Sequence, residues 1–305
     1  MGPTQPAYVA LENSGRLAEV EAELWRRFSP CQLCPRRCNA KRAEGERGEC
    51  GLAAELKVAS FGQHYGEEKP LVGRKGSGTI FFAHCNLLCI FCQNWEIAHK
   101  GEGLTVEVEK LAEIMLRLQE RGAHNINLVI PSHVLPAIVA ALRLAIHDGL
   151  RLPLVYNTGG YDAVEVVALL EGVIDIYMPD CKFQDAAWAA RLTHGADDYP
   201  EQARAAIVEM HRQVGDLVVR DGLATRGLLL RHLVMPHNAG GTDRFVRWVA
   251  ETLGPNTYVN LMAQYRPVYR ASEVAEIAHA LPRKDFEQAV AWARESGLQR
   301  LDGVD

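Results

Sequence analysis

Residues 82–95 read Phe-Ala-His-Cys-Asn-Leu-Leu-Cys-Ile-Phe-Cys-Gln-Asn-Trp and place three cysteines within eight positions. Cys85, Cys89 and Cys92 are separated by four and three residues, directly after a short apolar run at 79–82 that reads as a strand. Three thiolates at this spacing can hold one corner of a cubane cluster and leave one iron without a protein ligand. The stretch therefore predicts a catalytic [4Fe-4S] cluster on these three cysteines, with an open iron that can bind a small molecule.

Two other interpretations of the three cysteines remain open. Structural zinc needs four ligands, and the fourth would have to be His84, which adjoins Cys85 and must fold back to reach the metal. Thiols buried only for packing are rarely clustered so closely. A non-catalytic scaffold or electron carrier with iron–sulfur or zinc sites is the alternative function.

Strands and helices alternate regularly from residue 79 onward. Short apolar runs that read as strands lie at 79–82, 127–130, 153–156, 173–178, 228–234 and 258–262. Helical stripes lie between them, two of which end at Gly122 and Gly149. Such alternation implies a parallel sheet covered by helices. We predict a partial (β/α)6-type barrel, with an open doubly wound sheet as the alternative; in both, ligands bind at the carboxyl ends of the strands.

The segments between these strands suggest further boundaries. Residues 200–214 and 242–253 should form helices. Asp162 followed by Glu165 suggests a capped start for another helix, directly after the third strand. We expect one helix over the first 28 residues and an irregular wrap over 52–78. The chain then divides into an N-terminal extension at 1–75, a core barrel at 76–268 and a C-terminal helical segment at 269–305.

Composition restricts the class of protein. The chain has 305 residues, 48% of them hydrophobic, and a formal net charge of −5, which excludes a disordered protein and gives no footprint for nucleic acid. No segment approaches the roughly 18 apolar residues of a membrane span, and the N-terminus does not resemble a signal peptide. Clustered cysteines indicate a reducing compartment. We expect a cytoplasmic protein with neither nucleic acid nor a membrane as partner.

A second group of cysteines precedes the first strand. Cys31, Cys34, Cys38 and Cys50 supply four thiolates, enough for a closed metal site. Zinc fits the ligand count, whereas the Cys-Pro step and the close run of three cysteines are similar to ferredoxin-type cluster binding. Unbound reactive thiols are the third possibility, and the sequence does not choose among them.

Five phrases together with the cysteine motif carry a resemblance to a known family. They are Gly-Ser-Gly-Thr-Ile-Phe-Phe (76–82), Cys-Gln-Asn-Trp (92–95), Tyr-Asn-Thr-Gly-Gly-Tyr-Asp (156–162), Tyr-Met-Pro-Asp-Cys-Lys (177–182) and Leu-Arg-His-Leu-Val-Met-Pro (230–236). With Phe91 before the last cysteine of the motif, the chain resembles the radical S-adenosylmethionine superfamily, and within it the pyruvate formate-lyase activating enzyme-related proteins. The resemblance covers roughly residues 30–268.

The resemblance implies a specific chemistry. The amino and carboxylate groups of S-adenosylmethionine would chelate the open iron of the reduced cluster. One electron, supplied by reduced flavodoxin or ferredoxin, would then cleave the sulfonium to methionine and a 5′-deoxyadenosyl radical. That radical would abstract hydrogen from a protein or small-molecule substrate, which makes the chain an oxidoreductase. A narrower implication is the activation of a glycyl radical enzyme.

The loops after the second and third strands depart from the family pattern. Ile130-Pro131-Ser132-His133 stands where members commonly have Gly-Gly-Glu-Pro, so Ser132 and His133 would have to supply the polar contacts. Core packing or capping is the alternative for His133. Asn157 and Thr158 precede two glycines that permit close backbone approach to a ligand, although the related phrase begins with Asp.

The later strands supply the other expected contacts. Asp180 and Lys182 alternate onto one face, and the resemblance places such a pair in the S-adenosylmethionine pocket; a surface ion pair is the alternative. Cys181, on the opposite face, should be core. Arg231 and His232 interrupt an apolar strand and should face a cavity. The remaining candidates for cofactor binding are Phe91 and Asn94 of the cysteine loop.

Overall fold

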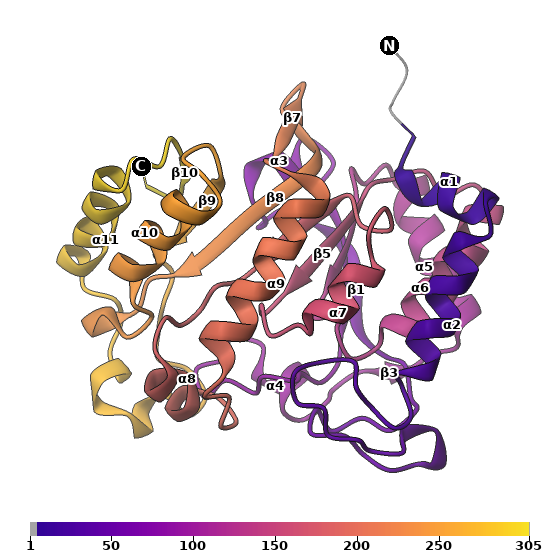
Figure 1. Ribbon diagram of the computed structural model, residues 1–305, viewed down its shortest axis with the longest axis horizontal. Helices are drawn as coiled ribbons and strands as arrows, with labels where there is room; N and C mark the ends of the chain where they lie inside the picture. The colour runs from indigo at the N-terminus through magenta and orange to yellow at the C-terminus, as the bar shows by residue number, and fades with distance from the viewer. Residues whose placement is uncertain (1–4, 305) are drawn as a thin grey trace.

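The computed structural model describes residues 5–304, in which one ten-stranded sheet organises the chain (Figure 1). The sheet follows the order β10-β9-β8-β6-β5-β4-β2-β1-β3, and β7 pairs with β8 outside this path. The strands are β1 (Lys57–His64), β2 (Ser77–Phe82), β3 (Leu104–Thr105), β4 (Ile126–Val129), β5 (Leu154–Thr158), β6 (Ile176–Pro179), β7 (Val218–Arg220), β8 (Leu223–Leu233), β9 (Tyr258–Met262) and β10 (Arg300–Asp302).

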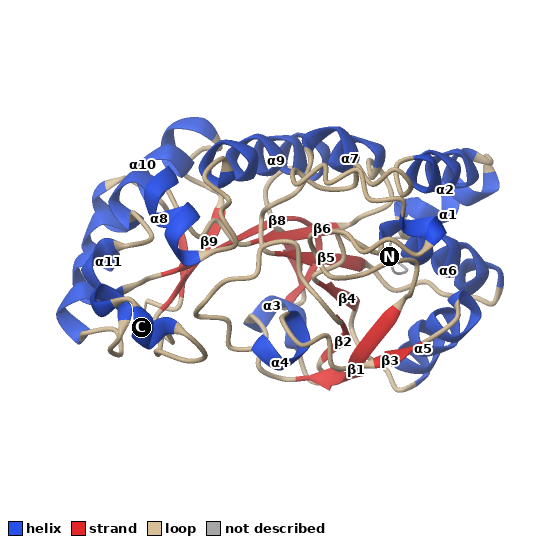
Figure 2. Cartoon of the chain, turned by 90° about the horizontal axis from the view of Figure 1, so that it is seen from below, coloured by secondary structure: helices blue, strands red, loops and turns tan. Residues whose placement is uncertain are grey.

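Most helices form a layer over the convex side of the curved sheet (Figure 2). They are α1 (Ala7–Asn13), α2 (Arg16–Arg26), α3 (Lys69–Val72), α4 (Trp95–Ala98), α5 (Val108–Glu120), α6 (Leu135–His147), α7 (Val164–Leu169), α8 (Ala186–Leu192), α9 (Tyr199–Val214), α10 (Thr242–Thr252) and α11 (Arg283–Glu295). Among residues 5–304, no helix is both long and apolar enough to cross a membrane.

The strand order confirms a partial barrel. From β2 to β10 the neighbouring strands of the main path are parallel and follow one another in chain order. A doubly wound sheet would reverse its order at a switch point. Because the terminal strands β3 and β10 are not paired with each other, the barrel stays open.

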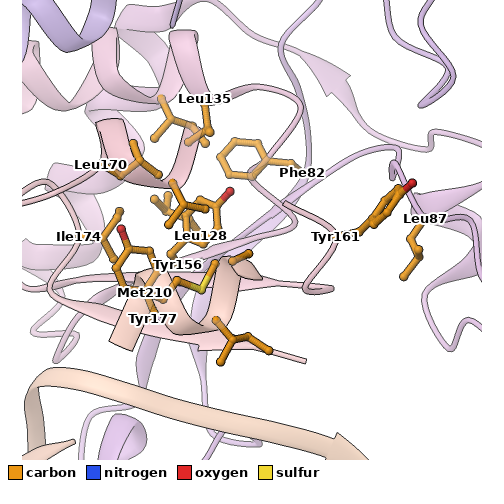
Figure 3. Packing of buried hydrophobic residues seen from close by; sticks show 14 of the residues in the cluster. Phe82, Leu87, Leu128, Leu135, Tyr156, Tyr161, Leu170, Ile174, Tyr177 and Met210 are labelled. Atoms are coloured by element: carbon orange, nitrogen blue, oxygen red, sulfur yellow. The ribbon is translucent and has the colours of Figure 1, made fainter. Parts of the chain in front are cut away.

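The pleat of each strand separates two environments. Leu128 and Tyr156 point outward, into the large core beneath the helices (Figure 3). Val155 and Met178 point inward and pack with Leu71 of α3 in a smaller core. Since successive residues alternate in direction, the inward face turns polar toward the carboxyl ends of the strands.

Individual elements near both ends of the chain differ from those expected. The predicted N-terminal helix is divided at Gly15, whose φ of +78° caps α2, and the predicted irregular wrap contains β1, which pairs antiparallel with β2. The C-terminal segment adds β10 to the sheet beside β9. The local signals were weak because most residues of β1 and β10 are only partly buried, so neither strand shows a continuous apolar run.

Candidate functional site

A cavity of about 250 Å³ opens at the carboxyl ends of the parallel strands. Its wall combines the cysteine loop with residues from β4, β5, β6, β8 and β9. Residues expected from the sequence that line it are Cys85, Cys89, Phe91, Cys92, Asn94, Asn157, Thr158, Asp180, Lys182 and Arg231. A larger groove of about 460 Å³ lies between α10 and α11, but surface side chains line it and no strand end opens into it.

The cysteine loop holds its three thiols at one wall of the cavity. Left-handed backbone at His84 (φ 70°) and Leu88 (φ 51°) turns the chain tightly on either side of Cys85. The Leu87 amide donates to Cys85 Sγ at 3.4 Å, and the Asn94 amide donates to Cys92. Amide donors two residues after a cysteine stabilise negative charge on its sulfur.

Burial favours the protonated form of two of these thiols, Cys89 and Cys92. It raises the pKa of Cys89 far above the ordinary range and that of Cys92 to about 11, and the neighbouring thiols add to both effects. All eight cysteines are free, and among the described residues no group of three or more His, Cys, Asp or Glu side chains is already arranged to hold a metal ion. Three soft donors converging on one cavity wall suit iron, which would displace the thiol protons on binding.

A buried ionic network faces the thiols. Arg231 donates through Nε to Asp180 Oδ1 at 2.8 Å and through Nη2 to Asn157 Oδ1 at 2.7 Å, and Lys182 contacts the other carboxylate oxygen. Burial alone would raise the pKa of Asp180, but Arg231 and Lys182 outweigh it and lower that pKa. Since Asp180, Lys182 and Arg231 lie on adjacent strand ends, the network presents two cations and one anion to the cavity.

Glu67 and Glu68 are charges of this site that sequence reasoning missed. They lie about 4 Å from Arg231 Nη1, at 3.9 and 4.0 Å respectively. Asn260 donates to Glu68 Oε1 at 2.9 Å, whereas Glu68 Oε2 is buried without a partner. Both acids precede α3, which lies against the concave side of the sheet (Figure 2). In the sequence, Glu67 and Glu68 precede Lys69-Pro70 and resemble part of a solvated linker. The only local signal of an ordered segment was Pro70, a residue common in the first turn of a helix.

Ser132 and His133 lie outside the cavity lining, contrary to expectation. Ser132 donates to Asp162 in a buried cluster. His133 is buried, pairs through Nε2 with the Ala83 carbonyl at 2.8 Å, and has its pKa lowered by burial to about 3. Left-handed backbone at Ile130 (φ 57°) redirects this loop, so that Ile130 itself meets the cavity. The core alternative therefore holds for His133.

His232 is likewise a core residue. It stacks on Phe245 with ring centroids 4.4 Å apart, and its two nitrogens pair with the Cys181 carbonyl at 2.6 Å and Thr242 Oγ1 at 2.9 Å. Strand alternation explains the difference, because Arg231 points into the barrel and its neighbour must point out. Cys181 is fully buried, as expected for a core residue.

The loop after β5 is fixed by hydrogen bonds to the buried carboxylate of Asp162. Asp162 accepts hydrogen bonds from Ser132, Tyr156 and Thr158, so it does not cap α7, whose start has no side-chain cap. Burial raises the pKa of Asp162 even though these hydroxyls lower it. Gly160 was expected to permit ligand approach, but a Cβ there would lie 2.1 Å from the Asp180 carbonyl. Gly160 therefore permits the close approach of the Asp180 backbone, and not of a ligand.

The four N-terminal cysteines lie together and pack on the cysteine loop. A Cβ at Gly48 would meet Cys38 Sγ at 3.2 Å and Cys50 Sγ at 3.6 Å, so these sulfurs flank one point. Burial raises the pKa of Cys34 to about 12 and also raises that of Cys50.

Two contacts join this array to the loop of the cavity. Arg36 donates to the Asn86 carbonyl at 2.9 Å. The His84 ring hydrogen-bonds the Cys50 backbone and fills the space beside Gly51 and Gly101. His84 is thus a link between the two arrays.

The protein is a half-open α/β barrel in which thiols and paired charges converge at the carboxyl ends of the strands. In α/β barrels this end of the strands holds the ligand. Over 284 residues the chain is 30% identical to the uncharacterized protein MJ0674 of Methanocaldococcus jannaschii, covering 90% of this chain and 77% of that protein. The chain belongs to the same family as MJ0674. No protein-family model matches it.

Two solved structures show distant likeness of fold. HydG, a maturase of the [FeFe]-hydrogenase, gives a TM-score of 0.49 at 17% identity over 70% of this chain and 47% of HydG. Native anSMEcpe, solved with bound AdoMet and the Cp18Cys peptide, gives 0.48 at 11% identity over 71% of this chain and 60% of that one. The chain thus spans about half of HydG and three fifths of anSMEcpe.

Proposed function

We propose that this protein is a radical S-adenosylmethionine enzyme whose [4Fe-4S] cluster is held by Cys85, Cys89 and Cys92. One observation carries the proposal. The three thiols share a cavity at the carboxyl ends of the strands with the buried Asp180–Lys182–Arg231 network. A closed electron-transfer site would use four protein ligands and needs no cavity, whereas three ligands beside a charged cavity suit a metal that also binds a small molecule.

When bound, the cluster and S-adenosylmethionine supply reductive cleavage of the sulfonium and a radical that abstracts hydrogen. The chain's own residues would position the cofactor. Lys182 and Arg231 offer cationic donors to its carboxylate, and Asp180 keeps both cations in place. Phe91 packs edge-on against Phe183 at 6.0 Å and gives the wall beside the thiols an apolar surface that limits water.

The test is anaerobic. The chain is reconstituted with iron and sulfide, reduced with dithionite and given S-adenosylmethionine. We expect 5′-deoxyadenosine and methionine in the wild type and in Cys181→Ala, a matched control in the same fold. Cys89→Ala should give neither product and should lose the visible absorption of the iron–sulfur cluster. A reconstituted wild type that forms no 5′-deoxyadenosine contradicts the proposal.

For the electron donor we propose reduced flavodoxin or ferredoxin. Beside the cysteine loop, Trp95 stacks on the exposed Tyr269 at 5.1 Å and Lys100 lies 4.3 Å from the Trp95 ring. Lys100 also pairs with Glu102 at 3.8 Å, so its ammonium is held at this aromatic surface, where it can meet an acidic partner. Lys100→Glu should slow product formation with the protein donor but leave the dithionite-driven reaction unchanged; equal slowing in both would contradict a donor site.

A further inference from the structure

Arg42 is a buried cation without a carboxylate partner. Its side chain is 0% exposed, and no Asp or Glu of residues 5–304 forms an ion pair with it. Nε donates to the Ala53 carbonyl and Nη1 to the His133 carbonyl, both at 2.8 Å, and the guanidinium lies 4.2 Å from the Phe28 ring centroid. Carbonyls and a ring satisfy hydrogen bonds but leave the charge uncompensated. Burial of a charge without a counter-charge is strongly unfavourable.

The guanidinium is aimed at the four N-terminal cysteines. Nη1 lies 3.8 Å from Cys31 Sγ, and Nη2 is buried with no hydrogen-bond partner. A Cβ placed on Gly48 would meet Cys38 Sγ, Cys50 Sγ and Arg42 Cδ, all within 3.9 Å. The sulfurs and the cation therefore surround one small region. An orphaned buried donor beside clustered thiols indicates that an anionic acceptor belongs there.

Backbone amides prepare two of these sulfurs in the same way. The Arg36 amide donates to Cys34 and the Leu52 amide to Cys50, each two residues after its cysteine. The loop at Cys85 repeats the arrangement. A sulfur that accepts an amide hydrogen bond is a better acceptor as thiolate than as thiol. These amides are therefore placed to stabilise sulfurs that carry negative charge when bound to a metal.

We propose that Cys31, Cys34, Cys38 and Cys50 form a closed tetrathiolate site for a soft metal centre, and that Arg42 is its internal counter-charge. Four thiolates around a divalent cation carry roughly two net negative charges. An oxidised cubane cluster in the same ligands carries a similar charge. Each thiol releases its proton to solvent on binding. The centre then supplies both the missing counter-charge and an acceptor for Nη2.

Arg42 also connects this centre to the cavity. Its Nη1 holds the carbonyl of His133, in the loop that follows β4, and Ile130 of the same loop lines the cavity. Metal binding in the N-terminal array should therefore order the wall of the other site. The proposal stands independently of the radical chemistry, because its ligands and its test do not involve the cavity thiols.

Cobalt(II) is the probe, added anaerobically to the full chain with Cys85, Cys89 and Cys92 changed to Ala. We expect one equivalent bound with the absorption of tetrahedral thiolate coordination. Loss of an interaction around the ligands typically weakens metal binding 10–100-fold, so Arg42→Gln should weaken cobalt binding by about that factor. Arg42→Lys, which keeps the charge, should recover most of it. Arg37→Gln is the control, since Arg37 is exposed and pairs with Glu165.

Absence of cobalt binding, or equal affinity in Arg42→Gln and the parent, overturns the proposal. If Arg42→Gln does not fold, thermal unfolding of the parent decides. Zn²⁺ should raise its midpoint, with no effect when the four N-terminal cysteines are Ser; an equal effect in both chains refutes the site. Parallel loading with zinc alone or with iron and sulfide identifies the metal, since only the cluster brings inorganic sulfide.

Discussion

Arg231 and Asp180 meet across an isolated parallel bridge beyond the end of β6, with Nε 2.8 Å from Oδ1. The pair lies at the point where the regular ladder between β6 and β8 has ended, so side chains hold the strand ends together where backbone pairing thins out. Asp180 at the same time contacts Lys182. One carboxylate therefore fixes both cations of the cavity, which makes it the residue on which this wall depends.

Asp180→Asn should destabilise the protein by roughly 3–5 kcal/mol, because it removes the carboxylate between two largely buried cations, and Glu67 and Glu68 remain close to Arg231 alone. Urea denaturation at pH 7 measures the loss. Asp221→Asn is the matched control: Asp221 lies at the exposed β7–β8 turn with φ 51°, a conformation that Asn accepts. Because the folded pKa of Asp180 is lowered, its contribution is present above the ordinary value of 3.8 and is lost as pH falls below it. Equal effects of the two variants would refute the assignment.

His232 should make stability depend on pH. Burial lowers its pKa from 6.5 to about 4, so the neutral ring is favoured in the folded state. Its contribution is complete above pH 6.5 and is lost as pH falls toward 4, with about 2 kcal/mol gone by pH 5. Denaturation of the wild type and His232→Gln at pH 7 and pH 5 measures this. The variant should have a lower free energy of unfolding at pH 7 but should lose less of it between pH 7 and pH 5. Equal losses in the two proteins would contradict this role of His232.

Gly159 and Gly160 offer a matched pair of substitutions in one loop. Gly160 has φ +82°, and a Cβ would lie 2.1 Å from the Asp180 carbonyl, whereas a Cβ on Gly159 meets only side chains at 3.6 and 3.7 Å. Gly160→Ala should cost more than the 1–2 kcal/mol of left-handed backbone alone, at roughly 3 kcal/mol. Gly159→Ala should cost less than about 1 kcal/mol. Thermal melts compare them, and a Gly159→Ala that is the worse of the two would disprove the packing argument.

Cys181 should be much less reactive than the partly exposed thiols of the metal-free protein. Burial raises its pKa to about 12, and Gln184 Nε2 donates a hydrogen bond to its sulfur at 3.0 Å. Cys85 and Cys38 are partly exposed. Iodoacetamide at pH 8, followed by peptide mass mapping, should modify these two at least about tenfold faster than Cys181, since the thiolate is the nucleophile. Comparable rates would show that Cys181 is accessible and would reopen it as a ligand.

Several features of the fold followed from local patterns. The apolar runs predicted six parallel strands of the barrel, and Gly122 and Gly149 terminate their helices with φ of +84° and +96°. These signals survive in one sequence because periodicity and left-handed glycine reflect backbone geometry over a few residues. Strand β1 and the edge strand β10 were missed because their pairing partners, and not their own composition, make them strands.

The sequence by itself determined which thiols are neighbours and which strand ends carry charge, because those facts depend on spacing and alternation within single segments. The tertiary structure decided which polar groups share the cavity. Glu68 meets Asn260 across 192 positions of chain, and Arg42 reaches the carbonyl of His133 across 91. Such contacts join residues far apart in the chain, and they form only when the curved sheet brings those residues together. No local sequence pattern specifies which distant group a buried charge will contact.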